Sequence, residues 1–365
     1  MFILHNLTII SLLFIGLFIE KRWKLSKYYI SPALAGGMIA MIVSGILYYF
    51  YSYTFIPNEW VVCFFVTAFL FSIGMKMGLT YQKKHIKHLF YLFGFSTFIL
   101  AIIELIAMIL FKNNSFLLQV YNSQTFSWNE EWIFRIQNWF SGSLVFQFHF
   151  SLIIVFILTP VVIRLMRNFQ FSEMKPYKTK DFHSWKLNAV MILFLVTIFA
   201  LFLKNMYLDE TLFIFDFVIS MVIGFVLGRR LKTRDSSQVD QWISSVLSAG
   251  TLSLYGFIIS MIFISSVHVW TGWSWNIVGL YSIKLILFTL LWIWVSRRWV
   301  KNHQKLVLIS ACWAFTLSAP VTCMNAMHSV VRRHGPADQV LLLIPPVILW
   351  LINYPHYWLL AFLYN

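Results

Sequence analysis

The sequence predicts an all-α polytopic membrane protein with about ten transmembrane helices. Hydrophobic residues make up 60% of the 365 residues and charged residues only 11%, whereas soluble proteins carry about 25% charged residues. Apolar runs of about 20 residues, the length that spans a bilayer, recur along the whole chain. Lys and Arg fall in clusters that alternate with gaps poor in basic residues, as expected when basic loops stay in the cytoplasm.

The first part of the chain carries five apolar runs. They cover, in order, about 2–19, 32–54, 60–75, 89–111 and 145–163. Basic clusters follow the first, third and fifth runs, and the gaps after the second and fourth runs are poor in Lys and Arg. The first run has neither a preceding basic region nor a small-residue cleavage site, so we expect an uncleaved span whose N-terminus lies outside the cell.

The second part repeats this alternation. Its five predicted spans cover about 188–203, 212–228, 243–267, 276–296 and 340–363. Residues 306–330 are also apolar, but a crossing there would place Arg332 and Arg333 outside, so we predict a re-entrant segment. Both termini then lie outside, and all but four of the 28 basic residues are cytoplasmic. The exceptions are Lys112, Arg135 and Lys204 outside and Lys284 within the membrane.

This layout predicts two halves, 1–167 and 188–365, joined by a cytoplasmic linker at 168–187. An odd number of spans in each half inverts the second half relative to the first, which is the inverted-repeat plan of many secondary transporters. The counterpart of 306–330 in the first half is a re-entrant segment near 132–150.

Motif and composition exclude several classes of function. The chain has no P-loop, no G-x-G-x-x-G, no H-E-x-x-H and no G-x-S-x-G, so we expect neither an enzyme nor an ATP-driven pump. Three scattered cysteines indicate no disulfide framework, and no cofactor is expected. The net charge of +15 follows the membrane topology, so a nucleic-acid partner is not expected.

The segment 306–330 combines a helix breaker with small and polar residues at membrane depth. Pro320 interrupts helical hydrogen bonding, and backbone groups released in lipid need water, protein or ligand as partners. One interpretation is a substrate or ion site, and the other is a proline-kinked helix packed against its neighbours. The candidate site residues are Ser318, Ala319, Pro320, Thr322 and Asn325.

In the first half, the candidate binding residues are Ser143, Gln147 and His149. Gln147 and His149 would share one side of an extended segment but diverge on a helix. A histidine inside the membrane is either a ligand or a packed structural residue.

Three charged residues fall inside predicted spans: Glu104 in the fourth, Asp216 near the outer end of the seventh, and Lys284 in the ninth. Such residues are costly in lipid and are functional candidates. The alternatives are a structural salt bridge or, for Lys284, a stem that reaches the interface.

Several segments resemble, in the same order, the motifs of the sodium/glutamate symporter family. The segment Tyr29–Gly37 is similar to I-P-x-P-V-A-G-G, Phe71–Met75 to F-x-T-I-G-L, and Val246–Tyr255 to V-L-G-x-x-S-L-S-L-F. The end of the chain resembles C-G-F-G-L-G-A-T-P-T-A-I-A-N-M, then G-P and L-V-V-P. The matching residues there are Cys312, Pro320, Asn325, Gly335, Pro336 and 341–345.

The resemblance implies ten spans in two inverted halves, with two re-entrant segments that build the substrate and Na+ site. It implies symport of glutamate or a similar small organic anion with Na+, or with H+, in a bacterial cell membrane. It also suggests a homodimer in the lipid bilayer. The resemblance does not indicate which metal, other than Na+, the protein would bind.

The chain departs from the family pattern where that pattern is richest in glycine. The first re-entrant motif, G-S-x-x-x-S-G-G-H-G-T-G-A-A-W, survives as Gly142, Ser143 and His149. In the second motif, Trp313, Phe315 and Ser318 stand at or near glycine positions. Two hypotheses therefore stand: a transporter that works by alternating access, and a homologue that no longer transports and acts as a membrane scaffold or partner.

Overall fold

A computed structural model places the helices of the chain. The structure describes residues 2–54, 57, 59–80, 142–167, 214–232, 237–271, 275–300, 302–318, 320–335 and 337. The chain divides into two compact units, which are described separately. Unit 1 comprises Met1–Ile15, Pro57–Lys83 and Lys178–Met261, and unit 2 comprises Gly16–Ile56, Lys84–Tyr177 and Ile262–Asn365. Each unit draws on both predicted halves of the sequence.

Every element in the described part of the chain is a helix. The helices are α1 (Phe2–Trp23), η1 (Leu25–Tyr28), α2 (Pro32–Tyr51), α3 (Glu59–Thr80), α7 (Gly142–Met166), α9 (Ile214–Leu231), α10 (Ser237–Thr271), α11 (Trp275–Trp299), α12 (His303–Leu317) and α13 (Pro320–His334). Among the described residues, four stretches are long and apolar enough to cross a membrane: Pro32–Tyr51, Val61–Leu79, His149–Met166 and Asp240–Trp270. The prediction of an all-α membrane protein is confirmed at this level.

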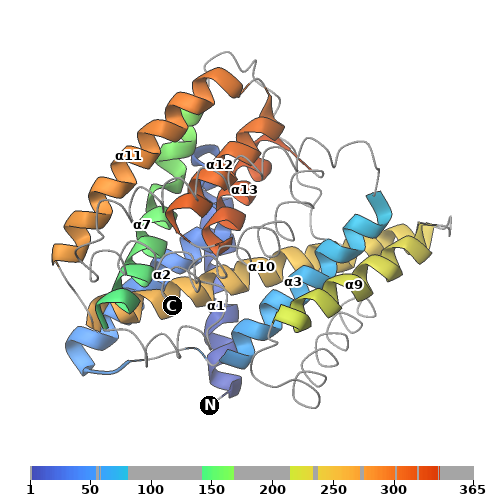
Figure 1. Ribbon diagram of the computed structural model, residues 1–365. Coiled ribbons are helices and arrows are strands. Elements are labelled where there is room, and N and C mark those ends of the chain that lie inside the picture. The colour runs from blue at the N-terminus through green and yellow to red at the C-terminus, as the bar shows by residue number, and fades with distance from the viewer. Residues whose placement is uncertain are drawn as a thin grey trace, which may run out of the picture. The chain divides into compact units, whose positions relative to one another are not determined.

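In unit 1, α3 and α9 lie side by side (Figure 1) and meet through glycines spaced four residues apart. A Cβ atom at Gly74 would overlap the carbonyl oxygen of Met221, and one at Gly224 would overlap that of Phe71. The contact is therefore reciprocal. It repeats one turn later, where Gly78 meets the carbonyl of Phe225 and Gly228 meets that of Met75. Small residues in this spacing let membrane helices approach to backbone contact.

The direction of these helices agrees with the charge pattern. The residues of α3 and α9 that touch rise in number together, so the two helices are parallel. Both were expected to run toward the cytoplasm, because basic clusters follow both. Helix α10 begins after the second of those clusters, and it runs against α3, since Gly250 faces Ser72 whereas Gly256 faces Phe65.

In unit 2, the glycine contacts also show the relative direction of α2 and residues 262–271 of α10. Gly37 faces Ile262, and Gly45 faces the indole of Trp270. Between these contacts, Ser44 Oγ and Ser266 Oγ share a hydrogen bond of 2.6 Å. The two helices are parallel, as expected for spans that both follow a basic cluster.

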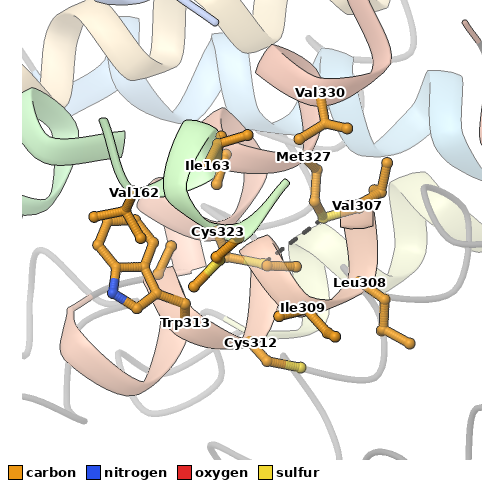
Figure 2. Packing of buried hydrophobic residues seen from close by; sticks show 14 of the residues in the cluster. Val162, Ile163, Val307, Leu308, Ile309, Cys312, Trp313, Cys323, Met327 and Val330 are labelled. Atoms are coloured by element: carbon orange, nitrogen blue, oxygen red, sulfur yellow. Dashed lines mark hydrogen bonds between the residues drawn. The ribbon is translucent and has the colours of Figure 1, made fainter. Parts of the chain in front are cut away.

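Unit 2 also holds a helical hairpin, α12 followed by α13, that packs on α7 and α11 (Figure 1). Figure 2 shows the apolar core between α7, α12 and α13, with Trp313 beside Val162. Cys323 and Met327 of α13 lie within this core, with 3.7 Å between their sulfur atoms. The core buries the apolar face of each element and so fixes the hairpin against α7.

The two predicted re-entrant segments have different outcomes. Residues 306–330 form two helices separated by a break, whereas residues 142–150 are the first turns of the continuous helix α7. Residues 132–141, and the predicted spans 89–111, 188–203 and 340–363, lie outside the described residues. The ten-span inverted repeat and the boundaries 1–167 and 188–365 remain predictions.

Candidate functional site

The candidate site is built around the break between α12 and α13. Asn302 begins α12, where its side chain accepts a hydrogen bond of 2.9 Å from the Lys305 backbone N–H. At the other end, Ser318 leaves helical geometry, with φ −155° and ψ −135°. Pro320 is the first residue of α13, a position where its missing N–H and fixed φ cost nothing. The sequence therefore ends one helix and starts the next within three residues.

Protein groups bind the backbone carbonyls that the break releases. The Ala314 carbonyl accepts two hydrogen bonds, from the Ser318 N–H at 3.1 Å and from Thr322 Oγ1 at 3.0 Å. The hydroxyl of Tyr281, on α11, donates to the Leu317 carbonyl at 3.0 Å. Since helix ends need partners for their free backbone groups, these contacts stabilise the break.

Helix α7 brings polar side chains to the same region. Ser151 Oγ lies 3.3 Å from Ser318 Oγ, and both residues are buried. Two residues earlier, His149 is completely buried, with its Nδ1 atom 3.0 Å from Ser265 Oγ. Its ring stacks on that of His268 at a centroid distance of 4.3 Å and an angle of 8°. Within the described residues, no three His, Cys, Asp or Glu side chains gather as metal ligands would.

Asn325 lies one and a half turns into α13 and is completely buried. Its Oδ1 atom accepts a hydrogen bond of 2.7 Å from Ser31 Oγ, at the start of α2. Its Nδ2 atom has no hydrogen-bond partner among the described residues. A buried amide donor without a partner costs free energy, so this atom is the strongest sign of a ligand position in the hairpin.

The far end of α13 is held by the connection between α1 and α2. Arg332 binds the carboxylate of Glu20 through two nitrogens, with N–O distances of 3.0 and 2.6 Å. The Arg333 guanidinium lies 4.6 Å from the centroid of the Tyr29 ring and also donates to the Lys27 carbonyl. Tyr29 adopts a left-handed backbone conformation, with φ 62°. These contacts fix α13 against residues 20–29.

In the same cluster, the pKa values of His334 and Tyr29 are both shifted. Tyr29 Oη and His334 Nε2 are 2.9 Å apart. Burial, together with the positive charges of Arg333 and Arg167, lowers the pKa of His334 to about 4. Burial raises the pKa of Tyr29, against the opposing effect of Arg333. Both side chains are therefore neutral near pH 7, and the hydrogen bond between them needs no net charge.

Large aromatic side chains fill the α12 face of the hairpin. Trp313 stands at a family glycine position and is completely buried, with its indole N–H donating to Thr289 Oγ1 at 3.1 Å. In return, Trp292 of α11 donates to Thr316 Oγ1 at 3.0 Å. The two contacts tie α11 and α12 together, so the hairpin is packed where a glycine would leave space.

The structure brings part of the predicted site together. Ser318, Pro320, Thr322 and Asn325 lie on the hairpin as expected, and His149 lies on α7, two residues from the serine that meets Ser318. Ser143 and Gln147 belong to α7, which is helical from Gly142 to Met166. Outside the described residues are Ala319, Glu104 and the side chains of Ser143, Gln147, Pro320 and Lys284.

Four residues at the site were not predicted from the sequence. They are Ser31, Ser151, Tyr281 and His268. Ser31 lies in the segment Tyr29–Gly37, whose resemblance to a family motif could have identified it as a candidate. The other three are ordinary residues of apolar helices, and only tertiary contacts identify them.

Comparison with known proteins supports the resemblance in the second half of the chain. A family model described as sodium/glutamate symporter matches residues 166–336, which include α9 to α13 and the whole hairpin. Comparisons with curated proteins and with solved structures gave no match. The match supports the resemblance to the sodium/glutamate symporter family over residues 166–336, slightly less than half of the chain.

Proposed function

We propose that this protein is a secondary transporter that moves glutamate or a similar small organic anion with Na+, or with H+, by alternating access. The family match supports sodium/glutamate symport at the level of the family. The substrate, the coupling ion and the site residues are our assignment.

The observation that carries the proposal is the broken helix with a buried amide nitrogen, Asn325 Nδ2, that has no hydrogen-bond partner among the described residues. The first turn of α13 leaves backbone N–H groups without helical partners, and its dipole favours negative charge. Asn325 adds a donor in the next turn of the same helix. Transporters commonly use the N-terminal end of a discontinuous helix for an anionic substrate, so we assign the substrate carboxylate to this end of the hairpin.

For the coupling ion, two sets of oxygen and nitrogen atoms are candidates. Ser151 and Ser318 offer hydroxyl oxygens that lie 3.3 Å apart, and hydroxyl and carbonyl oxygens suit Na+. The stacked pair His149 and His268 offers imidazole nitrogens for H+. The proposal therefore allows either ion, and the experiment below separates the two.

The aromatic packing of the hairpin favours the second hypothesis, a homologue that serves as a scaffold or partner in the membrane. Tyr281 and Thr322 already bind the carbonyls at the break, and a buried tryptophan replaces a glycine of the family pattern. A hairpin with these properties is stable without a ligand. This hypothesis predicts a membrane protein that neither transports nor binds small anions.

Uptake of labelled glutamate into proteoliposomes tests the two hypotheses. We expect uptake by the unmodified protein that depends on an inward Na+ gradient or, if protons couple, on a pH gradient. Asn325→Ala is expected to lower uptake at least tenfold. The control is Ser282→Ala, which removes a hydroxyl that bonds only locally, to the Val278 carbonyl.

The scaffold hypothesis gives the opposite results. No uptake of glutamate, aspartate or any dicarboxylate, together with no thermal stabilisation of the purified protein by these anions, would contradict the transporter. Uptake that is equal in the Asn325→Ala and Ser282→Ala variants would place the substrate elsewhere.

A further inference from the structure

A contact between the start of α2 and the middle of α13 specifies the role of Asn325. Ser31 Oγ donates to Asn325 Oδ1 at 2.7 Å, and the two residues are 294 positions apart in the chain. Ser31 is 1% exposed and Asn325 is 0% exposed. The hydrogen bond is therefore shielded from solvent, and a buried hydrogen bond is electrostatically stronger than one in water.

The direction of this hydrogen bond follows from the other role of Ser31. As the N-cap of α2, the Ser31 hydroxyl oxygen accepts the Leu34 backbone N–H at 3.1 Å. Its oxygen serves the helix, so its proton is the group available to Asn325, and a proton needs the carbonyl end of the amide. The amide nitrogen of Asn325 is left facing away from Ser31 and without a hydrogen-bond partner in the described part of the chain.

An asparagine oriented in this way offers a ligand its two N–H donors, while Ser31 occupies one of the two lone pairs of its oxygen. Donors bind a carboxylate, whereas a cation requires the oxygen. We propose that Ser31 is a positioning residue that holds the N–H donors of Asn325 in the orientation that binds the anionic substrate, with the oxygen of Asn325 engaged by Ser31 rather than by the coupling cation. This inference rests on the proposed transport function, and it narrows the substrate contact to a carboxylate oxygen on Asn325 Nδ2.

Nearby contacts make the role of Ser31 separable from general packing. The Arg332–Glu20 ion pair and the Tyr29–His334 contact independently fix α13 to the connection between α1 and α2. Loss of the Ser31 hydroxyl therefore frees the amide of Asn325 to rotate without releasing the helix that carries it.

The test compares three substitutions of Ser31 in transport assays. Ser31→Ala removes the hydroxyl and the cap, Ser31→Gly removes the hydroxyl but retains a favourable N-cap residue, and Ser31→Thr retains both. We expect KM for the anion to rise about 3- to 10-fold in the Ala and Gly variants, the effect of one hydrogen bond. The concentration of Na+ that gives half-maximal uptake, or the pH midpoint, is expected to stay unchanged. Ser31→Thr is expected to restore the normal KM, and Ser282→Ala serves as the matched control.

Each other outcome contradicts a defined part of the inference. A changed ion dependence with an unchanged KM would show that Asn325 binds the cation. Equal KM in all variants, with normal uptake by the unmodified protein, would overturn the positioning role but not the transport function. If the unmodified protein shows neither uptake nor thermal stabilisation by glutamate, aspartate or succinate, the transport function and this inference both fail.

Discussion

The α3–α9 contact of unit 1 and the hairpin of unit 2 solve the same packing problem in opposite ways. In the first, four glycines let two backbones touch without side chains between them. In the second, a buried tryptophan and several hydroxyl groups fill the space and bind the backbone. Only 15 of the 365 residues are glycine, and four of them lie in this one contact.

The difference shows which part of the molecule depends on geometry and which on side-chain chemistry. A glycine contact tolerates no added atom, whereas a side-chain contact loses stability when atoms are removed. Substitutions that add or remove volume should therefore affect the two regions oppositely, and the following predictions test this contrast from the largest effect to the smallest.

Trp313→Ala should have the largest effect, because it removes a fully buried indole and leaves Thr289 without its donor. We expect a loss of about 3–5 kcal/mol of stability, measured as a lower unfolding temperature of the purified protein in detergent. The control is Trp275→Ala, since Trp275 is 74% exposed. Equal losses in the two variants would show that the hairpin does not depend on this side chain.

Gly74→Leu should follow, because a side chain at this position meets the carbonyl of Met221 and backbone cannot rotate away. We expect a loss of about 3 kcal/mol, at the upper end of overpacking effects, seen as a reduced yield of monodisperse protein and a lower unfolding temperature. Gly279→Leu is the matched control, because no atom lies within 4 Å of a Cβ there. A stable Gly74→Leu variant would mean that α3 and α9 separate easily.

Glu20→Gln should cost about 1.5–3 kcal/mol, the range for hydrogen bonds to charged groups. The substitution leaves the guanidinium of Arg332, whose side chain is 16% exposed, without its carboxylate. The double variant Glu20→Gln with Arg332→Met should recover most of the loss, because no unpaired charge remains. Losses that simply add in the double variant would show that the two side chains do not interact.

The smallest effect is expected from His334, and it depends on pH. The pKa of His334 is lowered to about 4 in the folded protein, whereas the unfolded chain binds the proton near pH 6.5. The stabilising effect of the neutral ring is therefore full above pH 6.5 and is lost as the pH falls toward 4. In His334→Gln, the decline of unfolding temperature over this interval should be shallower than in the unmodified protein. Parallel declines would contradict this assignment.

Much of the fold follows from the sequence because lipid imposes simple rules. Apolar runs predicted seven of the helices that the structure describes. Basic clusters predicted the directions within each unit: in unit 1, α3 parallel to α9 and opposed to α10, and in unit 2, α2 parallel to residues 262–271 of α10. Pro320 and its small neighbours predicted the break between α12 and α13. These features depend on local composition, which a sequence displays directly.

The site was less predictable because its contacts join distant parts of the chain. Ser31 meets Asn325 and Ser151 meets Ser318 only after the helices have packed. The segment 142–150 has the polar residues of a re-entrant loop, yet it continues into α7 as one helix, because nothing between Gly142 and Pro160 interrupts the helical hydrogen bonds.

The reciprocal glycine contact also bears on how the protein is made. Gly74 and Gly224 are 150 residues apart, and ribosomes add about 5–20 residues per second, so α3 waits roughly 10–30 seconds in the membrane before α9 exists. A glycine surface can be exposed to lipid tails without a large cost in free energy, because it carries no polar side chain. The polar side chain of Asn325 would be costly in lipid without a partner, but Ser31 precedes it in the chain and has been synthesised before Asn325. The order of synthesis therefore suits both contacts: the glycine surface of α3 precedes its partner, whereas the polar Asn325 follows its partner.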